Sequence, residues 1–109
     1  MTITVANARN TSEGVYLGRF HPKFGQASPL ANPYQMNEHN SRDDVCEKYD
    51  LWIKEKIKVG DPLVIGALGD LIRRYKAQGD LTLICWCAPE RCHCDTVKRI
   101  VLKNLHLAK

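Results

Sequence analysis

The sequence predicts a small α/β protein of one domain, with a sheet of about three strands and helices packed on it. Three observations lead to this prediction. The chain has 109 residues, which is enough for one domain with one modest core. Two short strand-like segments precede two helical segments, and an apolar strand then leads into a last helix. The predicted order is therefore strand, strand, helix, helix, strand, helix, within a single domain of residues 1–109.

The first forty residues are predicted to hold two short strands and a long loop. Polar and apolar residues alternate from Thr2 to Val5, and a second apolar segment, Val15–Leu17, ends at Gly18. Residues 19–40 contain three prolines, which disfavour a helix. A structureless loop of this length in a compact domain is usually either functional or disordered. Because aromatic and apolar residues could anchor it, we expect an ordered, functional loop; these residues are Phe20, Phe24, Leu30 and Tyr34.

Two amphipathic helices are predicted next. Ser41 is the N-cap of the first, and apolar residues follow it at helical spacing. Gly60 ends that helix, Asp61 is the N-cap of the second, and Pro62 occupies its first position. Apolar residues at helical spacing again give the second helix one buried face.

The segment from residue 81 to residue 97 holds most of the side chains that carry chemistry. Leu81–Cys87 has no polar residue after Thr82, so we expect a strand covered on both faces in the middle of the sheet. A loop follows at residues 88–91, and the last helix is predicted over residues 93–107. Ligands of open α/β sheets bind beyond the carboxyl ends of strands, and a helix N-terminus attracts anions. The sequence therefore predicts a site here.

Composition and charge limit the class of protein. The sequence has no run of eighteen apolar residues and no basic segment followed by an apolar one at its start, so neither a membrane span nor a signal peptide is predicted. We expect a cytoplasmic protein whose five cysteines stay reduced. The net charge of +4 suits an anionic partner, although many small cytosolic domains are mildly basic without a functional reason. Lysines and arginines are dispersed along the chain, which disfavours nucleic acid without excluding it.

The cysteine-rich segment has four competing interpretations, and a metal site is the first. Thiolate and imidazole groups suit zinc, with Cys85, Cys87, Cys92 and His93 as the alternative ligand set. Structural zinc sites usually draw on two separated ligand pairs, whereas these candidates share one short stretch that would be strained around a single ion. We therefore expect no metal and no other cofactor, with zinc as the alternative.

A reactive thiolate is the second interpretation. Cys87 or Cys92, near a helix N-terminus and an arginine, would have a lowered pKa. The stretch from Cys85 to Arg91 has the C-x5-R spacing of phosphatase loops. It contains no glycine, however, and Glu90 would repel a phosphate, so phosphatase chemistry is disfavoured.

The third interpretation is a pocket for an anion or a nucleotide, with the cysteines as lining groups. His93 and Asp95 would then contact the ligand or cap the last helix. The fourth is that buried thiols only pack the end of the strand, because reduced cysteine behaves as a small hydrophobic residue. We prefer the pocket, expect simple packing for Cys46, and leave both open for Cys85.

The segment CWCAPERCHCD resembles the CWC-x-P-x-x-CH-G-D signature of a bacterial and phage family, the domain of unknown function 4326. Residues 16–19, 28–34 and 41–45 resemble its Y-x-GR, SPLGNP and sRe segments, and Tyr49 and Trp52 match its Y-x-x-W spacing. The resemblance covers nearly the whole chain and implies a compact α/β fold. It often implies a phage genome, hence the host cytoplasm, but no established activity. Cys94 replaces a glycine of the signature, which implies that Cys94 is not an essential ligand.

The resemblance also implies a set of binding residues. Arg19 and Arg42 would hold a phosphate or carboxylate group in two-pronged contacts. Ser28 and Asn32 would form hydrogen bonds with a sugar or a base. Opposite these residues stand four positions of the cysteine-rich segment: Cys87, Cys92, His93 and Asp95.

These observations predict a protein that binds a nucleotide or phosphosugar-like anion between residues 19–42 and the turn at residues 85–95. The protein would either sequester the ligand or process it. If it reacts at a glycosidic or phosphate centre, His93 or Asp95 would act as the acid or base. The alternative is a zinc-stabilised module that binds nucleic acid or protein. The sequence leaves enzymatic activity and oligomeric state open.

Overall fold

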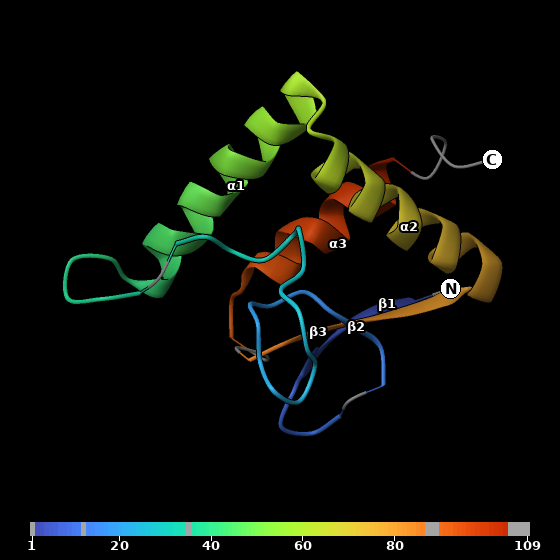
Figure 1. Ribbon diagram of the computed structural model, residues 1–109, viewed down its shortest axis with the longest axis horizontal. Coiled ribbons are helices and arrows are strands. Elements are labelled where there is room, and N and C mark those ends of the chain that lie inside the picture. The colour runs from blue at the N-terminus through green and yellow to red at the C-terminus, as the bar shows by residue number, and fades with distance from the viewer. Residues whose placement is uncertain (1, 12, 35, 87–89, 105–109) are drawn as a thin grey trace.

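The computed structural model describes residues 2–11, 13–34, 36–86 and 90–104. Two strands come first, β1 (Thr2–Asn7) and β2 (Val15–Tyr16). The helices α1 (Arg42–Val59) and α2 (Pro62–Gln78) follow, and the chain continues with β3 (Asp80–Cys85) and α3 (His93–Lys103) (Figure 1). The predicted α/β class and order of elements are confirmed.

All three strands are parallel, and β3 lies between β1 and β2, as the apolar sequence of β3 predicts. β1 pairs with β3 along its whole length, from Thr2 opposite Asp80 to Asn7 opposite Cys85. β3 ends at Cys85, two residues earlier than predicted, because the backbone bends at Trp86. Cys87 lies outside the described residues. The carboxyl end of the central strand is therefore reached soon after Cys85.

The three helices lie on one side of the sheet (Figure 1). Leu81, Leu83 and Cys85 alternate along β3 and join the helices in one hydrophobic core. Ile84 points to the opposite face and is fully buried, and its carbonyl oxygen accepts a hydrogen bond from the N–H of Leu17 at 3.1 Å. The carboxyl half of β3 is thus covered on both faces, as predicted.

Local signals set the ends of the helices. The Ser41 hydroxyl accepts the N–H of Asp44 at 3.2 Å, while the Asp44 carboxylate accepts the N–H of Ser41 at 2.9 Å. These two hydrogen bonds hold the pKa of Asp44 below its ordinary value. α1 stops at Gly60, whose φ of 72° is easily adopted only by glycine. Where the structure describes helices, none is long and apolar enough to cross a bilayer.

The last helix ends earlier than the sequence predicts. α3 stops at Lys103, and Asn104 caps it through its backbone N–H and its side-chain amide, which both donate to the carbonyl oxygen of Ile100. The predicted continuation to residue 107 is therefore wrong at residue 104, and residues 105–107 lie outside the described part.

Tertiary contacts, rather than regular structure, hold the long loop between β2 and α1. The hydroxyl of Tyr49 on α1 donates to the carbonyl oxygen of Leu30 at 2.8 Å, and both residues are fully buried. The N–H of Ser28 donates to the carbonyl oxygen of Gly18 at 2.9 Å. These contacts position the described part of the loop, and a function for the loop stays a prediction.

Candidate functional site

A cavity of about 480 Å³ opens at the carboxyl end of β3. The loop at residues 16–36, the first turns of α1, the end of β3 and the start of α3 all line it. Its volume is typical of sites that bind small molecules. It also lies beyond the carboxyl end of a strand, where open α/β sheets usually bind their ligands. The two segments between which the sequence predicts a pocket therefore face one cavity.

Arg19 is fixed at the edge of this cavity by backbone oxygens. Its Nε and Nη2 atoms donate to the carbonyl oxygen of Asn32 at 3.1 and 2.9 Å, and Nη2 also donates to that of Tyr34 at 2.9 Å. No acidic side chain pairs with Arg19 among the residues that the structure describes. The guanidinium charge is thus oriented but not neutralised.

Two further arginines line the cavity, and carboxylates accompany both. The Nε atom of Arg42 lies 2.9 Å from Glu90 Oε2. Arg91 contacts Asp43 at 3.1 Å and Asp50 at 3.9 Å. The hydrogen bond that Arg91 donates to the Asp43 carboxylate raises the pKa of Arg91 above its ordinary value. Arg91 was not among the predicted binding residues, and its place in the cavity follows from its position just before α3.

Asn32 and Ser28 are the two uncharged polar residues predicted to bind the ligand, and only Asn32 is among the described residues that line the cavity. Asn32 lines it, with its side-chain amide donating to the Val45 carbonyl oxygen at 3.3 Å. The Ser28 hydroxyl instead accepts the N–H of Leu30 at 3.0 Å. Ser28 is not among the described lining residues, so its hydroxyl shapes the loop.

His93, at the start of α3, is buried and lines the cavity. Its Nε2 atom lies 2.6 Å from the carbonyl oxygen of Leu17. Burial lowers the pKa of His93, although the hydrogen bond to Leu17 opposes that change. A carbonyl can only accept, so in the neutral ring Nε2 carries the proton. The Nδ1 lone pair is then directed toward Cys92, whose Sγ atom lies 4.0 Å away.

Asp95 caps α3. Its Oδ2 atom accepts the N–H of Cys92 at 3.1 Å, and the Cys92 sulfur in turn accepts the N–H of Cys94 at 3.2 Å. Asp95 is exposed and is not among the described residues around the cavity. The sequence suggests that Asp95 either contacts a ligand or caps the last helix, and the structure shows the helix cap.

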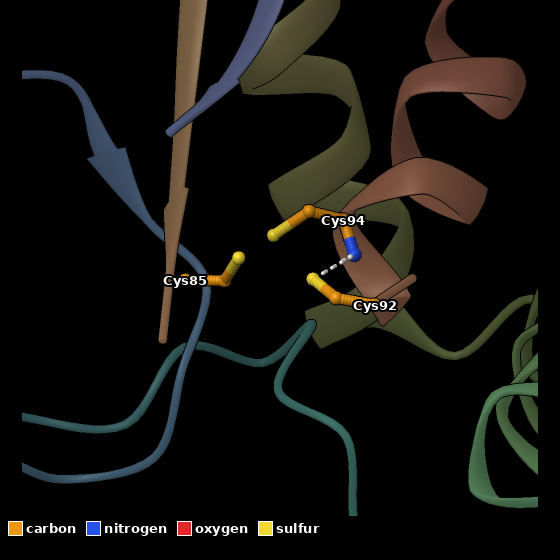
Figure 2. A group of neighbouring side chains, drawn as sticks. All are labelled: Cys85, Cys92 and Cys94. Carbon is orange, nitrogen blue, oxygen red and sulfur yellow. Dashed lines mark hydrogen bonds between the residues drawn. The ribbon is translucent and has the colours of Figure 1, made fainter. Parts of the chain in front are cut away.

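Three cysteines bring their sulfur atoms together beside the cavity (Figure 2). The Sγ atoms of Cys85, Cys92 and Cys94 all lie within 4.8 Å of one another, and all three residues are buried. The neighbouring Cys85 thiol and burial raise the pKa of Cys94 well above its ordinary value. Cys46 on α1 is also buried and lines the cavity, but it is not part of this group.

The sulfur group differs from the ligand set that the sequence suggests. Cys85 and Cys92 belong to it, Cys94 takes the place expected for His93, and Cys87 lies outside the described residues. Every described residue with positive φ is a glycine, and residues 87–89 of the connection between β3 and α3 lie outside the described part of the chain. The sulfurs converge because Cys85 ends β3 and the other two begin α3.

A comparison with protein families shows which family the chain belongs to. A family model described as Domain of unknown function (DUF4326) matches residues 3–103. The chain belongs to this family. No curated protein and no solved structure matches the chain. The family membership confirms the resemblance seen in the cysteine-rich segment and in the segments upstream of it.

In this DUF4326 chain, aromatic residues form a cavity wall that the sequence-based site did not include. Trp86 donates from Nε1 to the hydroxyl of Tyr16 at 3.0 Å. The ring centroids of His21 and Trp86 are 4.7 Å apart. A Cβ atom at residue 18 would lie 2.3 Å from the Tyr16 hydroxyl oxygen, so any larger residue in place of Gly18 would displace the Tyr16 ring from the wall. The Y-x-GR segment carries two of these residues, Tyr16 and Gly18, and was the available signal.

Proposed function

We propose that this protein binds an anionic small molecule of the nucleotide or phosphosugar class in the cavity at the end of β3. The proposal rests mainly on the position and the contacts of Arg19. Its guanidinium group lines the cavity and is held by two carbonyl oxygens, with no acidic partner among the described residues. Nε and Nη2 are engaged, so Nη1 is the amino group that would contact the ligand. An oriented arginine of this kind suits phosphate or carboxylate oxygens.

The aromatic wall supports a ligand that also has a ring or sugar. Trp86 is 37% exposed and Phe20 is 64% exposed, and both line the cavity. Exposed aromatic faces near a cation favour nucleobases, because every base offers a π-face for stacking. The cavity therefore combines a surface for stacking with a positive charge.

The groups around the cavity also limit the chemistry that would follow binding. Burial lowers the pKa of His93, which favours the neutral ring with Nδ1 able to accept a proton, whereas the Asp95 carboxylate is used in the helix cap. If the ligand is processed, His93 is the better candidate for the general base. In a phage-infected cytoplasm, the same pocket would equally serve to sequester a nucleotide.

Calorimetric titration tests the proposal with three probes: AMP, ribose 5-phosphate and uncharged adenosine. We expect AMP to bind more tightly than adenosine. Arg19→Gln should weaken AMP binding by about 10- to 100-fold, because a hydrogen bond to a charged group contributes about 1.5–3 kcal/mol. The matched control is Arg74→Gln, an exposed arginine on α2 that leaves the cavity unchanged.

Equal affinity for AMP and adenosine would contradict the proposal, as would an equal loss in the Arg19 and Arg74 variants. A short oligonucleotide that binds more tightly than AMP, with an affinity that falls steeply with salt, would instead favour the nucleic-acid-binding alternative.

A further inference from the structure

We propose that the sulfur atoms of Cys85, Cys92 and Cys94 bind a thiophilic divalent cation, with zinc as the expected ion. The three Sγ atoms lie within 4.8 Å of one another. Around a tetrahedral zinc ion, with Zn–S bonds of about 2.3 Å, sulfurs are about 3.8 Å apart. Small side-chain rotations would therefore bring these three sulfurs to a common ion. This inference does not depend on the proposed anionic ligand.

The fold holds the three sulfurs together from two elements. Figure 2 shows Cys85 at the end of β3 and the other two at the start of α3, with their sulfurs pointing into the space between. The N–H of Cys94 donates to the Cys92 sulfur at 3.2 Å. A hydrogen bond of this kind favours the charged form of its acceptor, which is the form that binds a metal.

The surroundings can balance the charge of such a complex. Three thiolates and one Zn²⁺ carry one net negative charge, which is costly to bury alone. The group lies at the N-terminus of the eleven-residue helix α3, whose dipole favours negative charge. Arg19 lines the same cavity and is not paired with an acid in the described part of the chain. These two features would offset the charge.

The ion would have one coordination position open to the cavity. Cys85 and Cys92 line the cavity, so the ion between them could be reached from it. His93 lies beside the group, with Nδ1 4.0 Å from Cys92 Sγ, but it does not belong to the mutually close set among the described residues. Three protein ligands and one exchangeable ligand are typical of zinc sites that contact substrates, rather than of purely structural sites.

Metal binding would release protons, because each thiol gives up its proton to solvent when it becomes a ligand. The affinity for zinc should therefore increase as the pH rises.

Metal binding to the full chain, reduced and freed of metal, provides the test. We expect one zinc ion per chain after gel filtration in the presence of Zn²⁺. Titration with Co²⁺ should give intense thiolate-to-cobalt charge-transfer bands and the visible bands of a four-coordinate ion. Both measurements use the unsubstituted protein, so they do not depend on how a variant folds.

Variants then locate the ion. Cys85→Ser and Cys94→Ser should each weaken zinc binding by at least about 100-fold. Cys46→Ser is the matched control, because Cys46 is a buried thiol at the same cavity but outside the sulfur group. Circular dichroism checks that each variant is folded.

Three results would overturn the metal site. They are no retained zinc at micromolar concentrations, six-coordinate cobalt bands without charge transfer, and an equal loss of zinc in the Cys46 variant. AMP binding is measured on the metal-free chain in a separate titration. Loss of zinc binding alone would then contradict the metal site, and loss of AMP binding alone would contradict the anion site.

Discussion

The imidazole of His93 donates to the backbone carbonyl of Leu17, with Nε2 and the oxygen 2.6 Å apart. This bond joins the start of α3 to the residue that follows β2, which are two sides of the cavity. It also determines the tautomer, because the proton on Nε2 leaves Nδ1 as an acceptor toward Cys92. One hydrogen bond thus orients a base and links two parts of the site.

The buried His93 should make stability depend on pH. Burial lowers the pKa of His93 in the folded state, so below about pH 6.5 the unfolded chain binds a proton that the folded chain does not. Stability is then present above pH 6.5 and is lost as the pH falls toward the folded pKa, by at most about 1.4 kcal/mol per pH unit. Urea unfolding between pH 7.5 and 5.5 measures this loss.

The His93→Gln variant should lack this part of the pH dependence, since a glutamine amide can still donate to Leu17. His39→Gln is the control, because the side chain of His39 is exposed and lies outside the cavity. If the wild type and His93→Gln show the same slope between pH 7.5 and 5.5, the assignment of a neutral buried His93 is wrong.

Arg19→Ala should loosen the long loop as well as weaken anion binding. The substitution removes donors to the carbonyl oxygens of Asn32 and Tyr34. We expect the free energy of unfolding to fall by about 1 kcal/mol, and residues 19–40 to be cleaved faster in limited proteolysis. Arg74→Ala should change neither quantity. A cleavage rate in Arg19→Ala that matches the wild type would show that the loop does not depend on these bonds.

Tyr49→Phe should destabilise the protein without changing its shape. The hydroxyl of Tyr49 is buried and donates to the Leu30 carbonyl oxygen, which would be left without this donor. We expect a loss of about 1–3 kcal/mol in urea unfolding, because unsatisfied buried polar groups cost this much. Tyr75→Phe, at another buried tyrosine on α2, is the comparison. A change below about 0.5 kcal/mol in Tyr49→Phe would count against a role in holding the loop.

Trp86 should report occupation of the cavity by fluorescence. The chain has two tryptophans. Trp86 lines the cavity, whereas Trp52, a residue of α1, packs against the hydrophobic core. A bound AMP would change the contacts of the Trp86 ring, so emission should change on titration. The signal should persist in Trp52→Phe and disappear in Trp86→Phe. A signal that follows Trp52 instead would place the ligand elsewhere.

Local signals predicted most of the fold. The Ser41 capping box and the Gly60-Asp61-Pro62 junction determine helix ends through contacts between residues close in sequence, and the apolar run of β3 requires cover on both faces. The sequence pattern predicts the end of the last helix too late, because apolar residues continue beyond Asn104, whereas the cap that ends the helix depends on Asn104 alone.

The site could be predicted only in outline. Residues of the loop and of the cysteine-rich turn line one cavity, and binding of a ligand there stays a prediction. The roles of single side chains depend on distant partners. Asp95 and Ser28 looked like ligand-binding groups and bond to nearby backbone instead. Tyr16 and Trp86 meet across seventy positions of the sequence, and no local pattern indicates that contact.

By itself the sequence determined the order of elements and the central position of β3, and it indicated the two segments that line the cavity. Those features depend on periodicity and capping, which act over a few residues. Only the tertiary structure decided that Cys94 joins Cys85 and Cys92, and that Arg19 lines the cavity with no acidic partner among the residues that the structure describes. These arrangements depend on the parallel pairing of strands and on the packing of the long loop against α1, which bring together atoms from distant parts of the chain.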